Sequence, residues 1–220
     1  GETTQVKATL YQILHSAFIT TGQRCSNARR LFLPDTAQGD HILEQLVEQC
    51  HLLSIGQYDE HPSPFMGPVI NITSAKLIIK QQQLLLSLGA NVLLSAHQAD
   101  ENSAFITPGL LDVSQLKQPF DEEIFGPVLS IIRADTIETA LEIENNNQYG
   151  NAAAVFTTSG QVAQTIAENA SAGMVGVNIG VPVPREPYSF GGWNQSKYGH
   201  GDITGRSGVE FWTNLKKVTA

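Results

Sequence analysis

The residue in this chain best suited to chemistry is Cys25, in the stretch 21–26 of sequence TGQRCS. A cysteine thiolate is a nucleophile that forms covalent intermediates, and a neighbouring cation or base favours its formation. Arg24 is such a cation, and its planar guanidinium could also bind a substrate carboxylate through two parallel hydrogen bonds. The alternative role for Arg24 is only to brace the loop. We interpret the stretch 21–26 as a nucleophile loop.

The second cysteine, Cys50, has a different setting. It lies on the apolar face of a helix expected over 39–54, together with Ile42 and Leu46. A small side chain on such a face is typical of a core residue, so we expect Cys50 to be inert. Two thiols in 220 residues do not make a disulfide scaffold, which favours a reducing compartment and predicts a cytoplasmic protein. Two cysteines and six histidines without ligand spacing predict no metal site.

Composition restricts the class of protein. The chain is 41% hydrophobic and 15% charged, which is typical of a globular protein with one well-packed domain. Its formal net charge of -8 disfavours binding to nucleic acid or to an anionic membrane surface. No apolar run is long enough to span a bilayer, and the first residues do not resemble a signal peptide.

The nucleophile loop follows a predicted helix over 3–20. Thr3 or Thr4 can cap the start of this helix, and Gly22 can end it. Cys25 is therefore expected just beyond a helix C-terminus. That end carries partial negative charge and does not stabilise a thiolate, so activation must come from Arg24 or from a base.

The remaining elements predict an α/β fold. Strands are expected at 28–33, 91–95, 127–133, 151–156 and 173–177, and helices at 73–88, 135–146 and 161–170. From residue 127 onward strands and helices alternate, which indicates a parallel sheet with right-handed crossovers. We expect three layers, a parallel sheet with helices on both faces.

Other segments are assigned more loosely. A short extended piece is expected at 104–107, an irregular segment at 113–120 and a capping box at 135–138. The Pro- and Gly-rich stretch after residue 180 is expected to be loop, with regular structure returning over 208–219. The sequence contains neither a Gly-x-Gly-x-x-Gly turn between a strand and a helix nor a P-loop lysine motif.

Four stretches together resemble the aldehyde dehydrogenase superfamily. They occur in the family's order along nearly the whole chain, and they are GQRC at 22–25, EEIFGPV at 122–128, NNNQYG at 145–150 and YSFGGW at 188–193. Each is weak alone, and the set in this order is specific. The resemblance implies the catalytic domain of an enzyme that oxidises aldehydes with NAD or NADP.

The resemblance assigns roles to particular residues. Cys25 is similar to the family's nucleophile, which would form a thiohemiacetal and then a thioester with the aldehyde carbon. Glu123 is similar to the carboxylate that holds the nicotinamide ribose, and Phe125 to the aromatic residue beside the nicotinamide. Phe190 would line the aldehyde tunnel, or alternatively belong to the core. The stretch 145–150 is mainly expected to cap a helix and form a tight turn.

Two subfamilies are indicated, and they imply different acyl acceptors. Residues 16–146 most resemble succinylglutamate semialdehyde dehydrogenases, whereas NIGVPVP at 178–184 and FWTNLK at 211–216 resemble methylmalonate semialdehyde dehydrogenases. Both imply a carboxylate-bearing semialdehyde, for which Arg24 would be the substrate-binding cation. They differ in whether water or coenzyme A takes the acyl group.

The resemblance also implies that the chain is incomplete. Residues 1–214 match the C-terminal, catalytic half of the family's enzymes, and 215–220 match the start of a truncated oligomerisation strand. The dinucleotide-binding domain and the general base would lie outside this chain, so the isolated chain is expected to be inactive. The full-length enzyme would be a homo-dimer or tetramer acting on a small-molecule aldehyde. The alternative is a non-catalytic remnant that serves as an interaction or assembly module.

Overall fold

A four-stranded sheet forms the centre of the computed structural model, which describes residues 6–118 and 120–219. Its strand order is β1 (Arg30–Pro34), β4 (Val128–Ala134), β3 (Gly109–Asp112) and β2 (Asn91–Leu94). β1, β4 and β3 are parallel, and β2 joins the far edge antiparallel to β3. The predicted α/β fold with a parallel sheet is confirmed, and the antiparallel edge strand was not anticipated.

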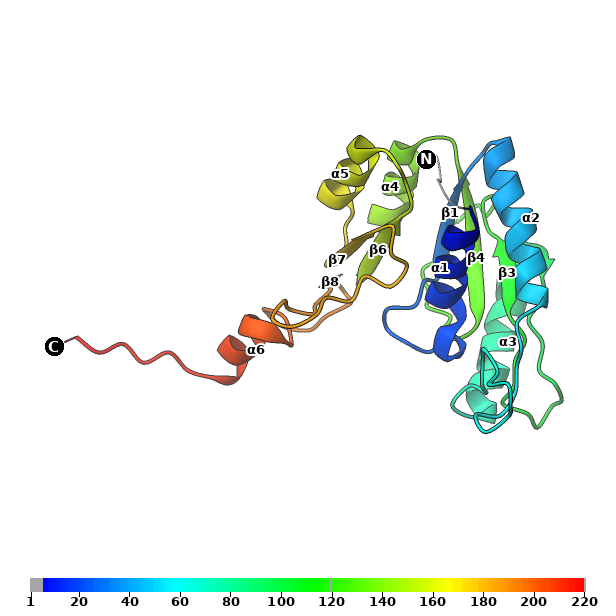
Figure 1. Ribbon diagram of the computed structural model, residues 1–220, viewed down its shortest axis with the longest axis horizontal. Helices are drawn as coiled ribbons and strands as arrows, with labels where there is room; N and C mark the ends of the chain where they lie inside the picture. The colour runs from blue at the N-terminus through cyan, green and yellow to red at the C-terminus, as the bar shows by residue number, and fades with distance from the viewer. Residues whose placement is uncertain (1–5, 119, 220) are drawn as a thin grey trace.

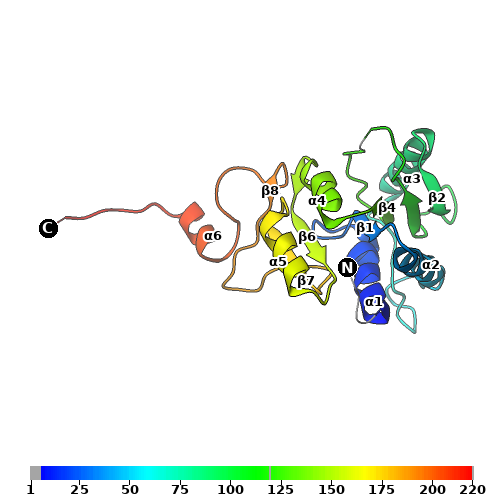
Figure 2. The ribbon, with the colours of Figure 1, turned by 90° about the horizontal axis from the view of Figure 1, so that it is seen from above.

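Helices cover both faces of this sheet (Figure 2). The helices α1 (Val6–Phe18) and α2 (Ala37–His51) pack on one face, and α3 (Ile72–Ser87) packs on the other. Side chains alternate along β4, so that Val128 joins the core under α3 while Leu129 joins the core under α1 and α2. Cys50 is 2% exposed within the latter core, as its position on the apolar helix face predicted.

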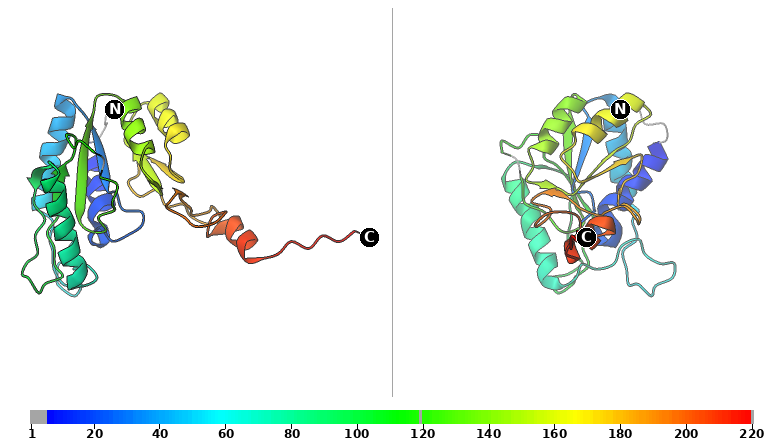
Figure 3. Two further views of the ribbon diagram at one scale, coloured as in Figure 1. Left: turned by 180° about the vertical axis from the view of Figure 1, so that it is seen from behind. Right: turned by 90° about the vertical axis from the view of Figure 1, so that its left-hand side faces the viewer.

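A second group of elements lies beside β1 (Figure 1). The parallel strands β6 (Ala152–Val155) and β7 (Met174–Val177) form a separate two-stranded sheet with the helices α4 (Ile137–Asn145) and α5 (Gly160–Asn169). The short strands β5 (Tyr149–Gly150) and β8 (Trp193–Asn194) pair antiparallel. The last helix, α6 (Gly205–Trp212), and the segment after it project away from the rest of the molecule (Figure 3).

Several local expectations need correction. The capping box at 135–138 is wrong in register, because the N-cap of α4 is Thr136, whose side chain accepts a hydrogen bond from the Thr139 amide. The strand β3 was missed: the expected piece at 104–107 contributes only an isolated bridge through Ile106. Regular structure ends at Trp212 within the described residues rather than continuing to 219. The expected caps of the first helix, Thr3 and Thr4, lie outside the described residues.

Among the described residues, no helix combines the length and the apolar character needed to cross a bilayer.

Candidate active site

A strained turn presents Cys25. After α1 the chain enters a short 3-10 segment, η1 (Ile19–Gly22), in which Thr20, Thr21 and Gly22 have φ angles of 56°, 55° and 67°. Positive φ is unusual for a β-branched residue and is kept only where the surroundings impose it. The Thr21 hydroxyl supplies one such constraint by donating to the Gly67 carbonyl at 2.9 Å. The turn leaves the Cys25 side chain exposed.

Close packing joins this turn to the loop that precedes β4. A Cβ atom on Gly22 would lie 2.2 Å from the carbonyl oxygen of Gly126, so only glycine permits this approach. Beside it, the Gln23 side-chain amide donates to the Phe125 carbonyl at 3.3 Å and accepts from the Ile70 amide at 2.8 Å. The first and second family-like stretches therefore meet in space, although about 100 residues separate them in the chain.

Asparagine side chains fix the backbone on either side of Cys25. Asn151 Nδ2 donates to the Cys25 carbonyl at 2.7 Å, which ties the nucleophile loop to the start of β6. The buried Asn27 Nδ2 donates to the Ser16 carbonyl at 2.8 Å and to the Ile19 carbonyl at 3.2 Å. No local pattern marks Asn151 as a site residue, because its partner is a backbone atom 126 residues away.

Arg29 connects the sequence-predicted residues and was missed as a site residue. Its Nη2 donates to the Arg24 carbonyl at 2.9 Å, and its Nε lies 3.4 Å from Glu123 Oε1. The guanidinium carbon lies 5.1 Å from the centroid of the Phe125 ring, a cation–π contact. Burial lowers the pKa of the Arg29 guanidinium, and the Glu123 carboxylate opposes that shift. The adjacent arginines at the start of β1 were the only sequence signal.

Two cavities meet at Glu123 and Phe125. The larger, of about 1150 Å³, is lined by Cys25, Arg29, Glu123, Phe125 and Phe190 among others. The smaller, of about 670 Å³, also includes Glu123 and Phe125 in its wall. The structure therefore brings four of the five sequence-predicted site residues to one cavity.

Arg24, the fifth predicted residue, has a different placement. Its side chain is exposed, and Arg24 is not among the described residues that line either cavity. Its backbone carbonyl is the acceptor for Arg29 and for the Asn27 amide, the latter at 3.2 Å. Among the described residues there is no group of three or more potential metal ligands.

The two cysteines are expected to react very differently. Burial raises the pKa of Cys50 to about 12, so its thiol stays neutral in the folded chain up to high pH. In the unfolded chain the same thiol would ionise near its ordinary value of about 8.5. Iodoacetamide at neutral pH should therefore alkylate the exposed Cys25 and leave Cys50 intact until denaturant is added. Peptide mass spectrometry measures both sites, and labelling of both at equal rates in the native chain would contradict this assignment.

Arg29 is expected to stabilise the site more than Arg24 does. Replacing Arg29 by alanine removes hydrogen bonds that join the nucleophile loop to Glu123. Because one partner is charged and the side chain is largely buried, we expect a loss of about 2–3 kcal/mol in the free energy of unfolding. Arg24→Ala is the matched control at an exposed side chain, with an expected change within about 0.5 kcal/mol. Urea unfolding of both variants checks this, and equal losses would refute it.

Comparison with known proteins identifies a family. The model of the aldehyde dehydrogenase family matches residues 2–218 of the chain. Among curated proteins, the N-succinylglutamate 5-semialdehyde dehydrogenase of Photorhabdus laumondii is 37% identical over 187 residues, which are 85% of this chain and 38% of that protein.

Solved structures agree with that match. A methylmalonate-semialdehyde dehydrogenase from Oceanimonas doudoroffii superposes with a TM-score of 0.88 at 29% identity, covering 98% of this chain and 46% of that one. A putative methylmalonate-semialdehyde dehydrogenase from Sinorhizobium meliloti, complexed with NAD, gives 0.88 at 30% identity, covering 96% and 44%. The resemblance to both kinds of semialdehyde dehydrogenase is confirmed, and the chain spans less than half of each relative.

Proposed function

The chain belongs to the aldehyde dehydrogenase family, and we propose that it is the catalytic part of an NAD(P)-dependent enzyme that oxidises a carboxylate-bearing semialdehyde through Cys25. The observation that carries the proposal is the shared cavity: an exposed thiol, Glu123 and Phe125 line it together. Arg29 links the loops that bear them. The family match supports the reaction class, and the semialdehyde relatives support the substrate class.

Cys25 would act as the nucleophile. Its thiolate adds to the aldehyde carbon to give a thiohemiacetal, whose loss of hydride leaves a thioester on the sulfur. The Cys25 backbone amide would donate to the oxygen that becomes negative in the first step. The hydrogen bond from Asn151 to the Cys25 carbonyl fixes the orientation of that peptide segment.

The cofactor fits the residues present. Glu123 Oε1 faces Arg29, and no further hydrogen bond to the Glu123 side chain occurs within the described residues, so the carboxylate can accept from two ribose hydroxyls. The Phe125 ring is partly exposed where the two cavities meet, which leaves a face for a nicotinamide ring. NAD or NADP would supply the hydride acceptor, and coenzyme A or water the acyl acceptor.

A single-turnover experiment tests this function. The purified chain is mixed with NAD and succinate semialdehyde, with and without coenzyme A, and NADH is followed together with alkylation of Cys25. We expect the aldehyde to protect Cys25 from iodoacetamide without a burst of NADH, since the sequence lacks a glycine-rich phosphate loop. Absence of protection would contradict the nucleophile assignment. A burst equal to the Cys25 concentration would contradict the expected inactivity of the isolated chain.

Although Arg24 lines neither cavity, it adjoins Cys25 in the chain, and we propose that its exposed guanidinium selects the substrate class. We expect Arg24→Ala to weaken protection of Cys25 by succinate semialdehyde by about tenfold, because a paired carboxylate is worth about 1–2 kcal/mol when partly exposed. Protection by propanal, which has no carboxylate, should not change. Alkylation rates measured over a range of each aldehyde give both affinities. An equal effect on the two aldehydes would favour the alternative in which Arg24 only braces the loop.

A cytoplasmic location and a homo-dimeric or tetrameric full-length enzyme stay predictions. So does the assignment of 215–220 to the start of an oligomerisation strand.

A further inference from the structure

The backbone amide of Cys25 is a free donor. The loop after η1 makes few backbone hydrogen bonds, and among the described residues the Cys25 amide donates to no acceptor. A backbone amide without a partner in the protein is available to water or to a ligand. Because Cys25 lines the larger cavity, a ligand bonded to its sulfur can also reach this amide.

The orientation of that amide depends on the Arg24 carbonyl, which belongs to the same peptide group. The Arg24–Cys25 peptide bond is trans, since the cis bonds of the described residues both precede prolines elsewhere. In a trans peptide the C=O and N–H bonds point in opposite directions, so a contact that fixes the carbonyl also fixes the amide. The Arg24 carbonyl accepts two hydrogen bonds, from the Asn27 amide at 3.2 Å and from Arg29 Nη2 at 2.9 Å. The Cys25 amide is therefore directed away from the Arg29 guanidinium.

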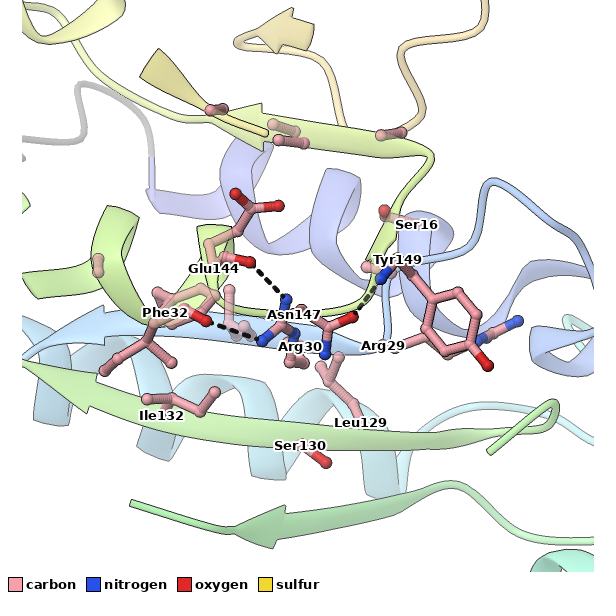
Figure 4. Close-up of a pocket in the computed structure, with 18 of the residues that line it drawn as sticks. Ser16, Arg29, Arg30, Phe32, Leu129, Ser130, Ile132, Glu144, Asn147 and Tyr149 are labelled. Atoms are coloured by element: carbon pink, nitrogen blue, oxygen red, sulfur yellow. Dashed lines mark hydrogen bonds between the residues drawn. The ribbon is translucent and has the colours of Figure 1, made fainter. Parts of the chain in front are cut away.

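Arg29 is itself held by two further contacts. Its Nε lies 3.4 Å from Glu123 Oε1, and its guanidinium carbon lies 5.1 Å from the centroid of the Phe125 ring. A guanidinium presents Nε and Nη2 in fixed directions, so one side chain can bond to Glu123 and to the Arg24 carbonyl together. The next residue, Arg30, extends instead to the end of α4, where it donates to two backbone carbonyls (Figure 4). The two adjacent arginines therefore hold different parts of the fold.

The positive charge of Arg29 is only partly neutralised. Glu123 is the one carboxylate paired with it in the described part of the chain, and their separation exceeds that of a tight ion pair. Arg29 Nη1 is buried and has no hydrogen-bond partner among the described residues. A cation at the carbonyl end of a peptide group draws electron density from the nitrogen and makes the N–H a stronger donor, most effectively away from bulk water. The Cys25 amide is thus polarised as well as oriented.

We propose that Arg29 is a positioning residue of the reaction, which orients and polarises the Arg24–Cys25 peptide group so that the Cys25 amide binds the oxygen of the aldehyde. As the sulfur forms its bond to the aldehyde carbon, the electron pair of the carbonyl double bond moves to that oxygen. Arg29 acts on this step only through the backbone. The inference rests on the proposed function, because it requires a covalent adduct on Cys25.

Two other roles of Arg29 lead to different results. A cation that only stabilised the thiolate would affect every reaction of Cys25. A residue that only braced the loop would change stability without a selective effect on one peptide group. Alkylation by iodoacetamide displaces iodide at a saturated carbon and forms no oxyanion, so it separates the first of these roles from the proposed one.

The first measurement is the ¹⁵N chemical shift of backbone amides in the free chain. A hydrogen bond accepted by a peptide carbonyl deshields the nitrogen of the same peptide group. Arg29→Met keeps the length of the side chain but cannot donate, so it should move the Cys25 nitrogen upfield. Asn151→Ala is the matched control: it removes the hydrogen bond to the Cys25 carbonyl and should move the Ser26 nitrogen instead. Each variant should affect its own peptide group more than the neighbouring one.

The second measurement compares two reactions of Cys25. In Arg29→Met the affinity for ¹³C-carbonyl-labelled succinate semialdehyde, read from the adduct signal, should fall about tenfold, because the amide donor is weakened and not removed. The rate of alkylation by iodoacetamide, taken at the plateau of its pH profile, should change by less than about threefold. Arg29→Lys, which keeps the charge near Glu123, carries both measurements if Arg29→Met does not fold, with changes expected in the same directions.

The outcomes separate this inference from the proposed function. An unchanged Cys25 nitrogen shift in a folded Arg29 variant, or an adduct as stable as in the unchanged chain, would overturn the role of Arg29 and leave Cys25 as the nucleophile. Equal losses of adduct affinity and alkylation rate would also overturn it, and would assign Arg29 to stabilising the thiolate. Absence of any adduct in the unchanged chain would refute the proposed function, and this inference with it.

Discussion

Replacing Cys25 by alanine is expected to abolish the covalent adduct between the chain and a semialdehyde while leaving the fold intact. The alanine side chain has no nucleophilic atom, and the other thiol, that of Cys50, is buried. The hydrogen bond at this position involves only the backbone carbonyl, which accepts from Asn151 and is retained. The free energy of unfolding should therefore change by no more than about 0.5 kcal/mol. NMR with ¹³C-carbonyl-labelled succinate semialdehyde detects the thiohemiacetal carbon directly.

The control for this variant is Cys50→Ala. It should retain the adduct and lose about 1 kcal/mol of stability, because it leaves a small cavity in the core under α1 and α2. If Cys25→Ala retains the adduct signal, another residue is the nucleophile. If both variants lose it, the loss reflects folding and not chemistry, and the assignment of Cys25 fails.

Gly22→Ala is expected to have the largest effect on stability of any single substitution proposed. The new Cβ would lie 2.2 Å from the Gly126 carbonyl oxygen, at a backbone φ of 67° that disfavours side chains. Separating the two loops to relieve the clash would move Cys25 away from Phe125. We expect a loss of about 2–4 kcal/mol in the free energy of unfolding, measured by urea denaturation.

Gly89→Ala is the matched control for the cost of placing a side chain at a positive φ angle. Gly89 also has a positive φ, of 106°, but its added Cβ would meet nothing within 4 Å. Gly89→Ala should therefore lose only the free energy needed to hold alanine at that φ angle, about 1 kcal/mol of the free energy of unfolding. Equal losses at the two positions would show that the close approach of Gly22 to Gly126 contributes nothing.

Local patterns predicted most of the elements that position the site. The apolar run at 127–133 predicted β4 within one residue at each end, because a strand buried on both faces must be continuously apolar. Gly89 marked the end of α3 because glycine adopts the left-handed conformation there. The strand β3 was missed because its four residues, Gly109–Asp112, are too few to show a period, and no local pattern marks its pairing with β2 and β4.

The site was predicted less completely. Cys25, Glu123, Phe125 and Phe190 were selected through motifs, and the structure places all of them at one cavity. Their roles in the reaction stay proposals. Arg29 was not selected, because its importance lies in contacts with Arg24 and Glu123, one of them 94 residues away.

The sequence by itself determined the family, most of the helices and longer strands, and the burial of Cys50. These follow from residue types and short-range spacing, which local conformation and burial dictate. Only the tertiary structure decided that Gly22 packs on Gly126, that Arg29 joins the two loops, and that residues of β1 and β6 line a common cavity. Those facts depend on contacts between segments that lie 94 residues or more apart in the chain, and no local pattern encodes such contacts.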